Sequence, residues 1–298
     1  MCPVGTGISL GPFCFRFYGM IIMAGVIVAA VIATRLVSNR GKDPELVWEA
    51  LLWVLFLGLI GARLYHVFTP SKGSGITTSY YFQNPLEILF VWKGGLGWPG
   101  AILGGILGLY IFSRRSKLSV LFLLDVTAPV VAIAHAIGRW GNYVNQELYG
   151  PPTSVPWCIY IKPINRLPEV MDSACFHPLF LYESLWNLLI GLFLLWLGHG
   201  IASAIKPRGF LKKIAKPFQW LERRFASLRE KLILGDIFLG YLVLYPFGRF
   251  LLEFIRLDYV PLFGINFNQM LMLVVAITSL LVLILRHRLS ARKASGVK

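Results

Sequence analysis

The chain has 298 residues, of which 56% are hydrophobic and only 14% are charged, and its mean hydropathy is +0.67. A water-soluble domain carries roughly a quarter charged residues, so this composition excludes a cytosolic globular enzyme, a disordered protein and a small disulfide scaffold. The 29 Lys and Arg residues outnumber the 14 Asp and Glu residues, but no nucleic-acid-binding motif accompanies them, and we expect no nucleic-acid partner. The chain is therefore predicted to be an all-α integral membrane protein.

About seven segments are long and apolar enough to cross a bilayer, which takes roughly 20 residues in a helix. The third is the weakest, because it is rich in glycine and interrupted by Pro99. The last is the most apolar, with no charged residue from Phe267 to Leu285. In chain order the predicted spans are 17–34, 46–68, 95–113, 119–138, 179–200, 233–256 and 267–286.

The Lys and Arg residues are divided unequally between the connections. Twenty of the 29 fall in the first, third and fifth connections and in the tail, and only four fall in the second and fourth connections. Loops that stay in the cytoplasm carry the excess of these residues. The sequence therefore predicts an N-terminus outside the cell and a C-terminus in the cytoplasm.

Two segments between the spans are not expected to cross the membrane, within a single seven-span membrane domain over 1–298. Residues 141–178 contain six prolines and are predicted to form a small extracytoplasmic head. Residues 202–232 place apolar residues three and four apart with cations between them, which is typical of an amphipathic helix on the anionic inner leaflet. A helix that binds a partner protein is the alternative.

Five arginines lie within a predicted span or at its outer end. Charged residues at such positions are costly and usually functional, and arginine is the residue best suited to bidentate recognition of phosphate. For Arg16, a side chain that reaches the membrane interface is the alternative. We predict a site for a phosphate group at the outer leaflet. The five are Arg16, Arg63, Arg139, Arg249 and Arg256.

The densest polar stretch runs from Gly138 to Gly150, where the fourth span leaves the membrane. Arg139 supplies a fixed cation, Asn142 and Asn145 offer amide donors and acceptors, and Glu147 can hold the arginine or act as a base. The three glycines allow close backbone approach. A capped helix end is the alternative, but it does not account for this polar set at a lipid interface.

This stretch resembles the signature of the prolipoprotein diacylglyceryl transferase family. The pattern is Gly-Arg-x-Gly-Asn-aromatic-x-Asn-x-Glu-x-aromatic-Gly, and every fixed position is met. The similarity extends along almost the whole chain, and the family's seven spans with an outer N-terminus agree with the charge distribution. Further matching runs are Arg16–Gly19, Gly61–Tyr65, His177-Pro178 with Leu181–Glu183, and Arg249-Phe250 with Glu253, Arg256 and Asp258.

The resemblance implies a reaction in the bacterial cytoplasmic membrane, among the membrane lipids, with no cofactor and no metal. The diacylglyceryl group of phosphatidylglycerol moves to the lipobox cysteine thiol of a prolipoprotein, forming a thioether and releasing glycerol phosphate. This chemistry needs a stabilised phosphate and a deprotonated thiol. We predict catalytic roles for Arg139, Arg249 and Glu147. Glu147 and Glu253 can also orient the arginines beside them. The predicted phosphatidylglycerol-binding residues are Tyr18, Arg63, Arg139, Asn142, Asn145, Gly150, Arg249, Glu253 and Arg256.

One position departs from the family pattern. The family commonly has Gly-Gly-x-x-x-His-Gly at the start of the third span, and Pro99 stands here in place of that histidine. His135 lies one helical turn before Arg139 and is predicted to assist catalysis instead, with a packed core histidine as the alternative. His66 and His177 are weaker substitutes. The other functions that the sequence allows are a catalytically impaired lipid-binding relative and a transporter of phosphorylated anions.

Overall fold

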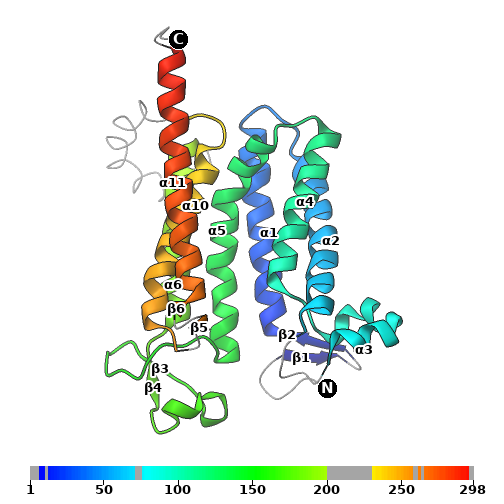
Figure 1. Ribbon diagram of the computed structural model, residues 1–298, viewed down its shortest axis with the longest axis vertical. Helices are drawn as coiled ribbons and strands as arrows, with labels where there is room; N and C mark the ends of the chain where they lie inside the picture. The colour runs from blue at the N-terminus through cyan, green and yellow to red at the C-terminus, as the bar shows by residue number, and fades with distance from the viewer. Residues whose placement is uncertain are drawn as a thin grey trace. The chain divides into compact units, whose positions relative to one another are not determined.

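Long helices make up most of the computed structural model, which describes residues 7–10, 13–70, 76–199, 230–257, 261–262 and 265–294. Each of the seven predicted spans corresponds to one of these helices (Figure 1). The all-α prediction is therefore confirmed. The long helices are α1 (Phe17–Ser38), α2 (Glu45–Phe68), α4 (Trp98–Ser116), α5 (Val120–Asn145), α6 (Leu179–His199), α10 (Asp236–Leu252) and α11 (Phe267–Ala294).

Among the described residues, six of these helices are long and apolar enough to cross a membrane. Helix α4 is not among the six, because its glycines and its two arginines in the last turn reduce its hydropathy. Its 19 residues are nevertheless close to the length that a bilayer requires. The protein is a multi-pass membrane protein with about seven spans.

The remaining elements are short and lie in the connections. The strands are β1 (Gly7–Leu10), β2 (Phe13–Arg16), β3 (Ile159–Tyr160), β4 (Cys175–Phe176), β5 (Pro261–Leu262) and β6 (Ile265–Asn266). In the described part of the chain, these six strands form three separate antiparallel pairs, β1–β2, β3–β4 and β5–β6. The short helices are α3 (Thr78–Gln83), η1 (Pro85–Leu89), η2 (Val91–Lys93), η3 (Pro163–Asn165), η4 (Pro168–Val170) and η6 (Glu253–Ile255).

The chain divides into two compact units, and residues 37–123 form the smaller one. Here α2 and α4 run antiparallel and meet along glycines. A Cβ on Gly61 would lie 2.2 Å from the carbonyl oxygen of Gly100, and one on Gly104 would lie 2.1 Å from that of Leu57. The prediction that Pro99 interrupts this span is wrong: Pro99 lies in the first turn of α4, where its missing N–H has no partner to lose.

The larger unit contains residues 1–36 and 124–298, and its helical core is formed by α5, α6 and α10. Helix α10 packs against both α6 and α11. Small and branched residues of α5, α6 and α10 interdigitate in this core, as in other membrane bundles. The core residues are Ala128 and Ala132 of α5, Ile190 and Leu194 of α6, and Ile237 of α10.

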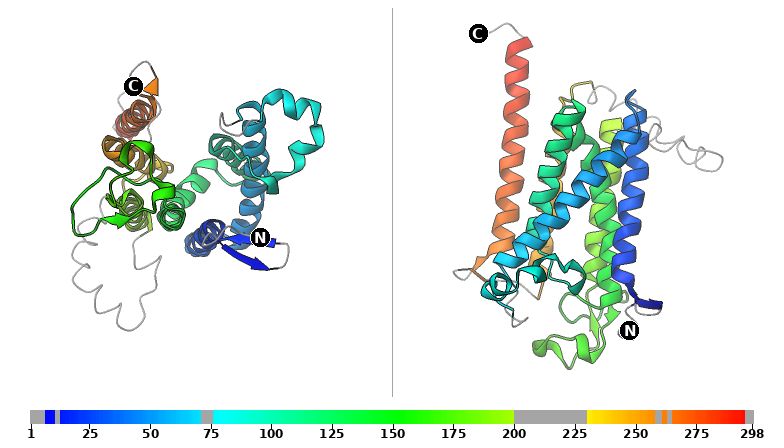
Figure 2. Two further views of the ribbon diagram at one scale, coloured as in Figure 1. Left: turned by 90° about the horizontal axis from the view of Figure 1, so that it is seen from below. Right: turned by 90° about the vertical axis from the view of Figure 1, so that its right-hand side faces the viewer.

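The predicted head lies between α5 and α6 in the same unit, beyond the ends of both helices (Figure 2). Helix α5 continues to Asn145, so the first residues of segment 141–178 are helical. A disulfide joins Cys158 to Cys175, next to the β3–β4 pair. Buried Tyr149, Ile161 and Phe176 form a small core of their own.

Two of the sequence predictions lie outside the described residues. All but the last three residues of the amphipathic segment 202–232 are in this group, as is Asp258. The amphipathic helix therefore stays a prediction.

The glycine contact between α2 and α4 can be tested with two neighbouring substitutions. Gly104→Ala forces a methyl group against the Leu57 carbonyl and should destabilise the protein by about 1–3 kcal/mol. Gly105→Ala is the matched control: its Cβ would meet Val54 Cγ1 at an ordinary 3.6 Å, and alanine should stabilise the helix by up to about 1 kcal/mol. Thermal unfolding in detergent compares them, and equal melting temperatures would contradict the packing.

Candidate functional site

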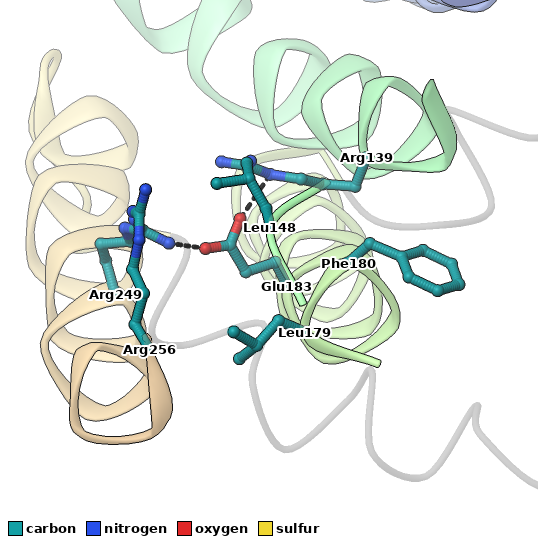
Figure 3. Close-up of a pocket in the computed structure, with 7 residues that line it drawn as sticks. All are labelled: Arg139, Leu148, Leu179, Phe180, Glu183, Arg249 and Arg256. Atoms are coloured by element: carbon teal, nitrogen blue, oxygen red, sulfur yellow. Dashed lines mark ion pairs between the residues drawn. The ribbon is translucent and has the colours of Figure 1, made fainter. Parts of the chain in front are cut away.

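Glu183, in the first turns of α6, bridges two arginines from different helices. Its Oε2 pairs with Nε of Arg139 on α5, and its Oε1 pairs with Nη1 of Arg249 on α10. Figure 3 shows the carboxylate between the two guanidinium groups. Only 5% of Glu183 is exposed, so its carboxylate depends on the two arginines, and each arginine on the carboxylate, for charge compensation within the bundle.

A second carboxylate extends the cluster along α10 and η6. Glu253 lies one helical turn after Arg249, and its Oε2 is 3.2 Å from Nη2 of that arginine. The same oxygen is 3.7 Å from Nη1 of Arg256. The prediction that Glu253 orients Arg249 agrees with this geometry.

The three arginines border a small pocket, which has a charged side and an apolar side. Three guanidinium groups face two carboxylates, so with both carboxylates ionised the cluster carries one surplus positive charge. A pocket of this charge is suited to one anionic group with an apolar chain attached. The lining residues are Arg139, Leu148, Leu179, Phe180, Glu183, Arg249 and Arg256.

The end of α5 carries a chain of polar contacts that leads away from Arg139. Its Nη1 donates to Oδ1 of Asn142 at 3.3 Å, and Nδ2 of Asn142 donates to Oε1 of Glu147 at 2.9 Å. Asn145 donates to the same oxygen at 3.3 Å. Glu147 thus reaches Arg139 through Asn142, while the ion-pair partner of Arg139 is Glu183. That Glu147 orients Arg139 stays a prediction.

The second half of the signature anchors the head. Gln146 and Leu148 both have positive φ, +54° and +55°, a conformation that non-glycine residues adopt at a cost. Gln146 Oε1 offsets that cost by accepting from Lys162 N and Asn165 Nδ2, both at 3.0 Å. This turn directs Leu148 into the pocket.

Gly150 joins the head to the start of α6. Its N–H donates to the carbonyl of His177 at 2.9 Å. A Cβ at this position would lie 2.9 Å from His177 Cβ and 3.1 Å from the carbonyl oxygen of Ile255. Glycine is therefore needed at position 150 for this close approach to His177. His177 lies six residues before Glu183, which borders the pocket.

Two residues from the beginning of the chain have different surroundings. Tyr18, in the first turn of α1, packs against Gly141, where a Cβ would lie 2.5 Å from Tyr18 Cδ2. Its hydroxyl group is close enough to Glu147 and Arg139 to interact with their charges. Arg16 ends β2 and is exposed, in agreement with the interfacial alternative.

His135 lies deeper in the bundle than the pocket-lining residues. Its ring packs against Tyr245 of α10, with ring centroids 5.2 Å apart, and Tyr245 in turn interacts with Arg139. The recorded contact is that of a packed aromatic residue. His135 is connected to the charge cluster through Tyr245 and does not line the pocket.

Arg63 belongs to the smaller unit, and its recorded partners are main-chain carbonyls of that unit. Nε donates to Ile88 O at 2.8 Å, and Nη1 donates to Gly94 O at 2.7 Å and to Gly95 O at 3.0 Å. The guanidinium also lies over the Tyr81 ring. Arg63 therefore organises the segment before α4, and its phosphate-binding role stays a prediction.

The predicted site does not include Glu183, which bridges two of its arginines. Glu183 belongs to a run that matches the family, but the sequence pattern gives it no role. An isolated acid near one end of an apolar span is itself a signal, because such charges need a buried partner. Arg139 and Arg249, on two other spans, likewise need a buried anionic partner.

The fold and the site together define an integral membrane protein with a buried arginine–glutamate pocket that carries a cation surplus. The sequence profile of the prolipoprotein diacylglyceryl transferases matches residues 6–213 and 218–285. The chain belongs to this family, and it is a membrane transferase.

Three relatives illustrate the similarity, and each is described as a phosphatidylglycerol–prolipoprotein diacylglyceryl transferase. The protein from Synechococcus elongatus is 35% identical over 91% of this chain and 83% of its own length. A Streptomyces coelicolor protein, the second of that name, is 35% identical over 95% and 80%. The Frankia alni protein is 36% identical over 84% of this chain but only 57% of its own length.

The bridging role of Glu183 predicts a large loss of stability on its neutralisation. Glu183→Gln leaves two arginines, each with only 15% of its side chain exposed, without their shared anion, which should cost about 3–5 kcal/mol. Glu169→Gln, an exposed position in the head, is the control and should change stability by less than about 0.5 kcal/mol. Thermal unfolding of the purified proteins measures both, and a Glu183→Gln protein as stable as the control would contradict the bridge.

Proposed function

We propose that this protein transfers the diacylglyceryl group of phosphatidylglycerol to the lipobox cysteine of prolipoproteins. Its relatives are named phosphatidylglycerol–prolipoprotein diacylglyceryl transferases, and the chain carries every fixed position of the signature from Gly138 to Gly150. The observation that carries the proposal is the pocket between Arg139 and Arg249, with its surplus of one cation and its apolar wall.

The chemical step is a displacement at a glycerol carbon. The thiolate sulfur forms a C–S bond, the bond from that carbon to the phosphate oxygen breaks, and glycerol phosphate leaves with the bonding electrons. Negative charge grows on the departing phosphate, and Arg139 and Arg249, joined by Arg256, stabilise it. In a dry site such preorganised donors contribute more than they do in water.

Residues around the pocket hold the lipid and the arginines in place. Glu253 positions Arg249 and Arg256, and the Asn142–Glu147 pair positions Arg139. Tyr18, Asn145 and Gly150 shape the outer rim next to the head, where the glycerol headgroup binds. Arg63 acts by ordering the segment that leads into α4.

Deprotonation of the thiol requires little help. A free thiol with a pKa near about 8.5 is already a few per cent thiolate at neutral pH, and nearby arginines favour the anion further. Pro99 in place of a histidine is therefore compatible with an active enzyme. We propose that His135 assists the proton transfer through its neighbour Tyr245.

The protein resides in the bacterial cytoplasmic membrane, with the N-terminus and the head outside and the C-terminus in the cytoplasm. The distribution of Lys and Arg between the connections supports this orientation. The orientation places the charge cluster, at the head end of α5 and α10, in the outer leaflet. Prolipoproteins would meet it there with their lipobox cysteines.

A transfer assay with a lipobox peptide and phosphatidylglycerol vesicles tests the reaction. The protein should add the mass of one diacylglyceryl group to the peptide. Arg139→Lys and Arg249→Lys should each lower the rate by more than about a hundredfold, because a point charge cannot replace the bidentate fork. Arg288→Lys, on the exposed face of α11, is the control and should match the parent.

Each result of this assay separates the candidate functions. A parent protein that binds the lipid but leaves the peptide mass unchanged is a catalytically impaired relative. Movement of a phosphorylated anion across a sealed vesicle, without transfer, would indicate a transporter. Full activity in either lysine variant would contradict direct phosphate binding by that arginine.

The role of His135 is visible in the pH dependence of the rate. If His135 accepts the proton, His135→Gln should be slow near pH 7 and approach the parent rate near about pH 9, where the thiol ionises unaided. The measurement is the initial transfer rate between pH 6 and pH 9. A variant that matches the parent at every pH would remove His135 from the mechanism.

Labelling with a membrane-impermeant thiol reagent tests the orientation. In a background without native free thiols, a cysteine at exposed Lys162 in the head should react in intact cells. A cysteine at exposed Lys117, between α4 and α5, should react only after the cells are opened. The reverse pattern would place the pocket on the cytoplasmic side and contradict the proposal.

A further inference from the structure

Helix α10 starts at a residue that cannot cap it. Gly235 is the N-cap residue, has a φ of +101° and offers no side-chain hydrogen bond, yet the first N–H groups of a helix need partners from outside it. Asp125, on the neighbouring helix α5, supplies them. Its Oδ2 accepts from Gly235 N at 2.6 Å and its Oδ1 accepts from Phe238 N at 3.0 Å.

These two bonds reproduce a capping box across two helices. In a capping box, the N–H groups of the N-cap residue and of the third helical residue are bound by side chains of the same helix. Here one carboxylate from α5 binds both. Only 3% of Asp125 is exposed, and a buried anion at a helix N-terminus is favoured by the helix dipole. Two hydrogen bonds therefore join the start of α10 to Asp125 of α5.

Two further contacts join α5 and α10 at the same offset in sequence. Asp125 and Gly235 are 110 residues apart. His135 packs against Tyr245, and Arg139 and Arg249 both pair with Glu183. The members of each of these pairs, His135–Tyr245 and Arg139–Arg249, are also 110 residues apart. Both helices start at the same end of the unit (Figure 1).

Because the sequence offset is the same in all three pairs, paired residues of the two parallel helices lie at matching levels along the helix axes. From Asp125 and Gly235, ten residues along each helix lead to the aromatic pair and fourteen lead to the arginine pair. At 1.5 Å per residue these levels lie about 15 Å and about 21 Å from the cap. A slide of α10 by one residue would move Arg249 by about 1.5 Å and turn it by about 100°. It could then no longer face Glu183 opposite Arg139.

We propose that Asp125 is a positioning residue: by capping α10 it fixes the axial register of α10 against α5, and so sets Arg139 and Arg249 at one depth around Glu183. Its effect on catalysis rests on the proposed function. Its effect on the register does not.

The same end of α10 offers a matched control. Asp236 joins α10 to α11 through His287 Nε2 at 2.7 Å and Arg286 Nη1 at 3.5 Å. Replacing Arg286 and His287 together by alanine loosens this end of the helix but leaves the Asp125 cap in place. The control separates a general loss of packing from a loss of register against α5.

The experiment measures a distance and a rate in the full chain, inserted in bilayer discs that contain phosphatidylglycerol. Spin labels on cysteines at Trp140 and Leu251, both 46% exposed, report the separation of the outer ends of α5 and α10. Cys2 and Cys14 are replaced by serine in this background. Transfer to a lipobox peptide is measured on the unlabelled variants.

Asp125→Ala should shift or broaden the distance distribution. It should also lower the transfer rate at least about tenfold, since a misplacement of about 1 Å can cost a hundredfold. Asp125→Asn keeps one acceptor oxygen and should give an intermediate result in both readouts. If Asp125→Ala is not recovered from the membrane, the measurements on Asp125→Asn decide the test. The Arg286→Ala, His287→Ala control should keep the parent distance and rate.

An unchanged distance in both Asp125 variants would overturn the inference, whatever happens to the rate. A control that shifts the distance as much as Asp125→Ala does would also overturn it. If the parent protein transfers nothing and the Asp125 variants still shift the distance, the proposed function fails and the register role stands.

Discussion

The structure of the site depends on one buried carboxylate held between two arginines. Glu183 is almost fully excluded from solvent and pairs with Arg139 on one side and Arg249 on the other. A buried guanidinium is costly without a partner, so three helices must bring these residues to one point. Sharing offsets this cost, because three arginines pair with two carboxylates, Glu183 and Glu253. This charge balance supports the proposal that the pocket binds an anion.

Much of the surrounding structure maintains this arrangement. The polar chain through Asn142 and Glu147 holds Arg139 from the head side, and Glu253 holds Arg249 along its own helix. The head is anchored by the strained turn at Gln146 and by Gly150. These contacts explain why several positions of the signature carry the residues they do. Part of their role is to fix the places of the arginines and of the apolar wall of the pocket.

The sequence predicted the spans and the family because both depend on local patterns. Apolar length defines a span regardless of its neighbours, and the run from Gly138 to Gly150 is specific within thirteen residues. The partners of charged side chains could not be predicted in the same way. Glu147 is eight residues from Arg139 and Glu183 is 44 away, yet Glu183 forms the ion pair. The carbonyl partners of Arg63 likewise cannot be predicted from its position in a span, because they become available only when the chain before α4 folds back.

A distance between the lipid phosphate and the arginine side chains would test the central claim most directly. Solid-state NMR can measure dipolar coupling between ³¹P of phosphatidylglycerol and guanidinium ¹⁵N in the membrane-embedded protein, with Arg139→Lys and Arg249→Lys assigning the signals. Phosphate held by this cluster should show coupling that corresponds to hydrogen-bonded N–H groups, and each lysine variant should remove part of it. Coupling that survives both substitutions unchanged, or none in the parent, would contradict phosphate binding at Arg139 and Arg249.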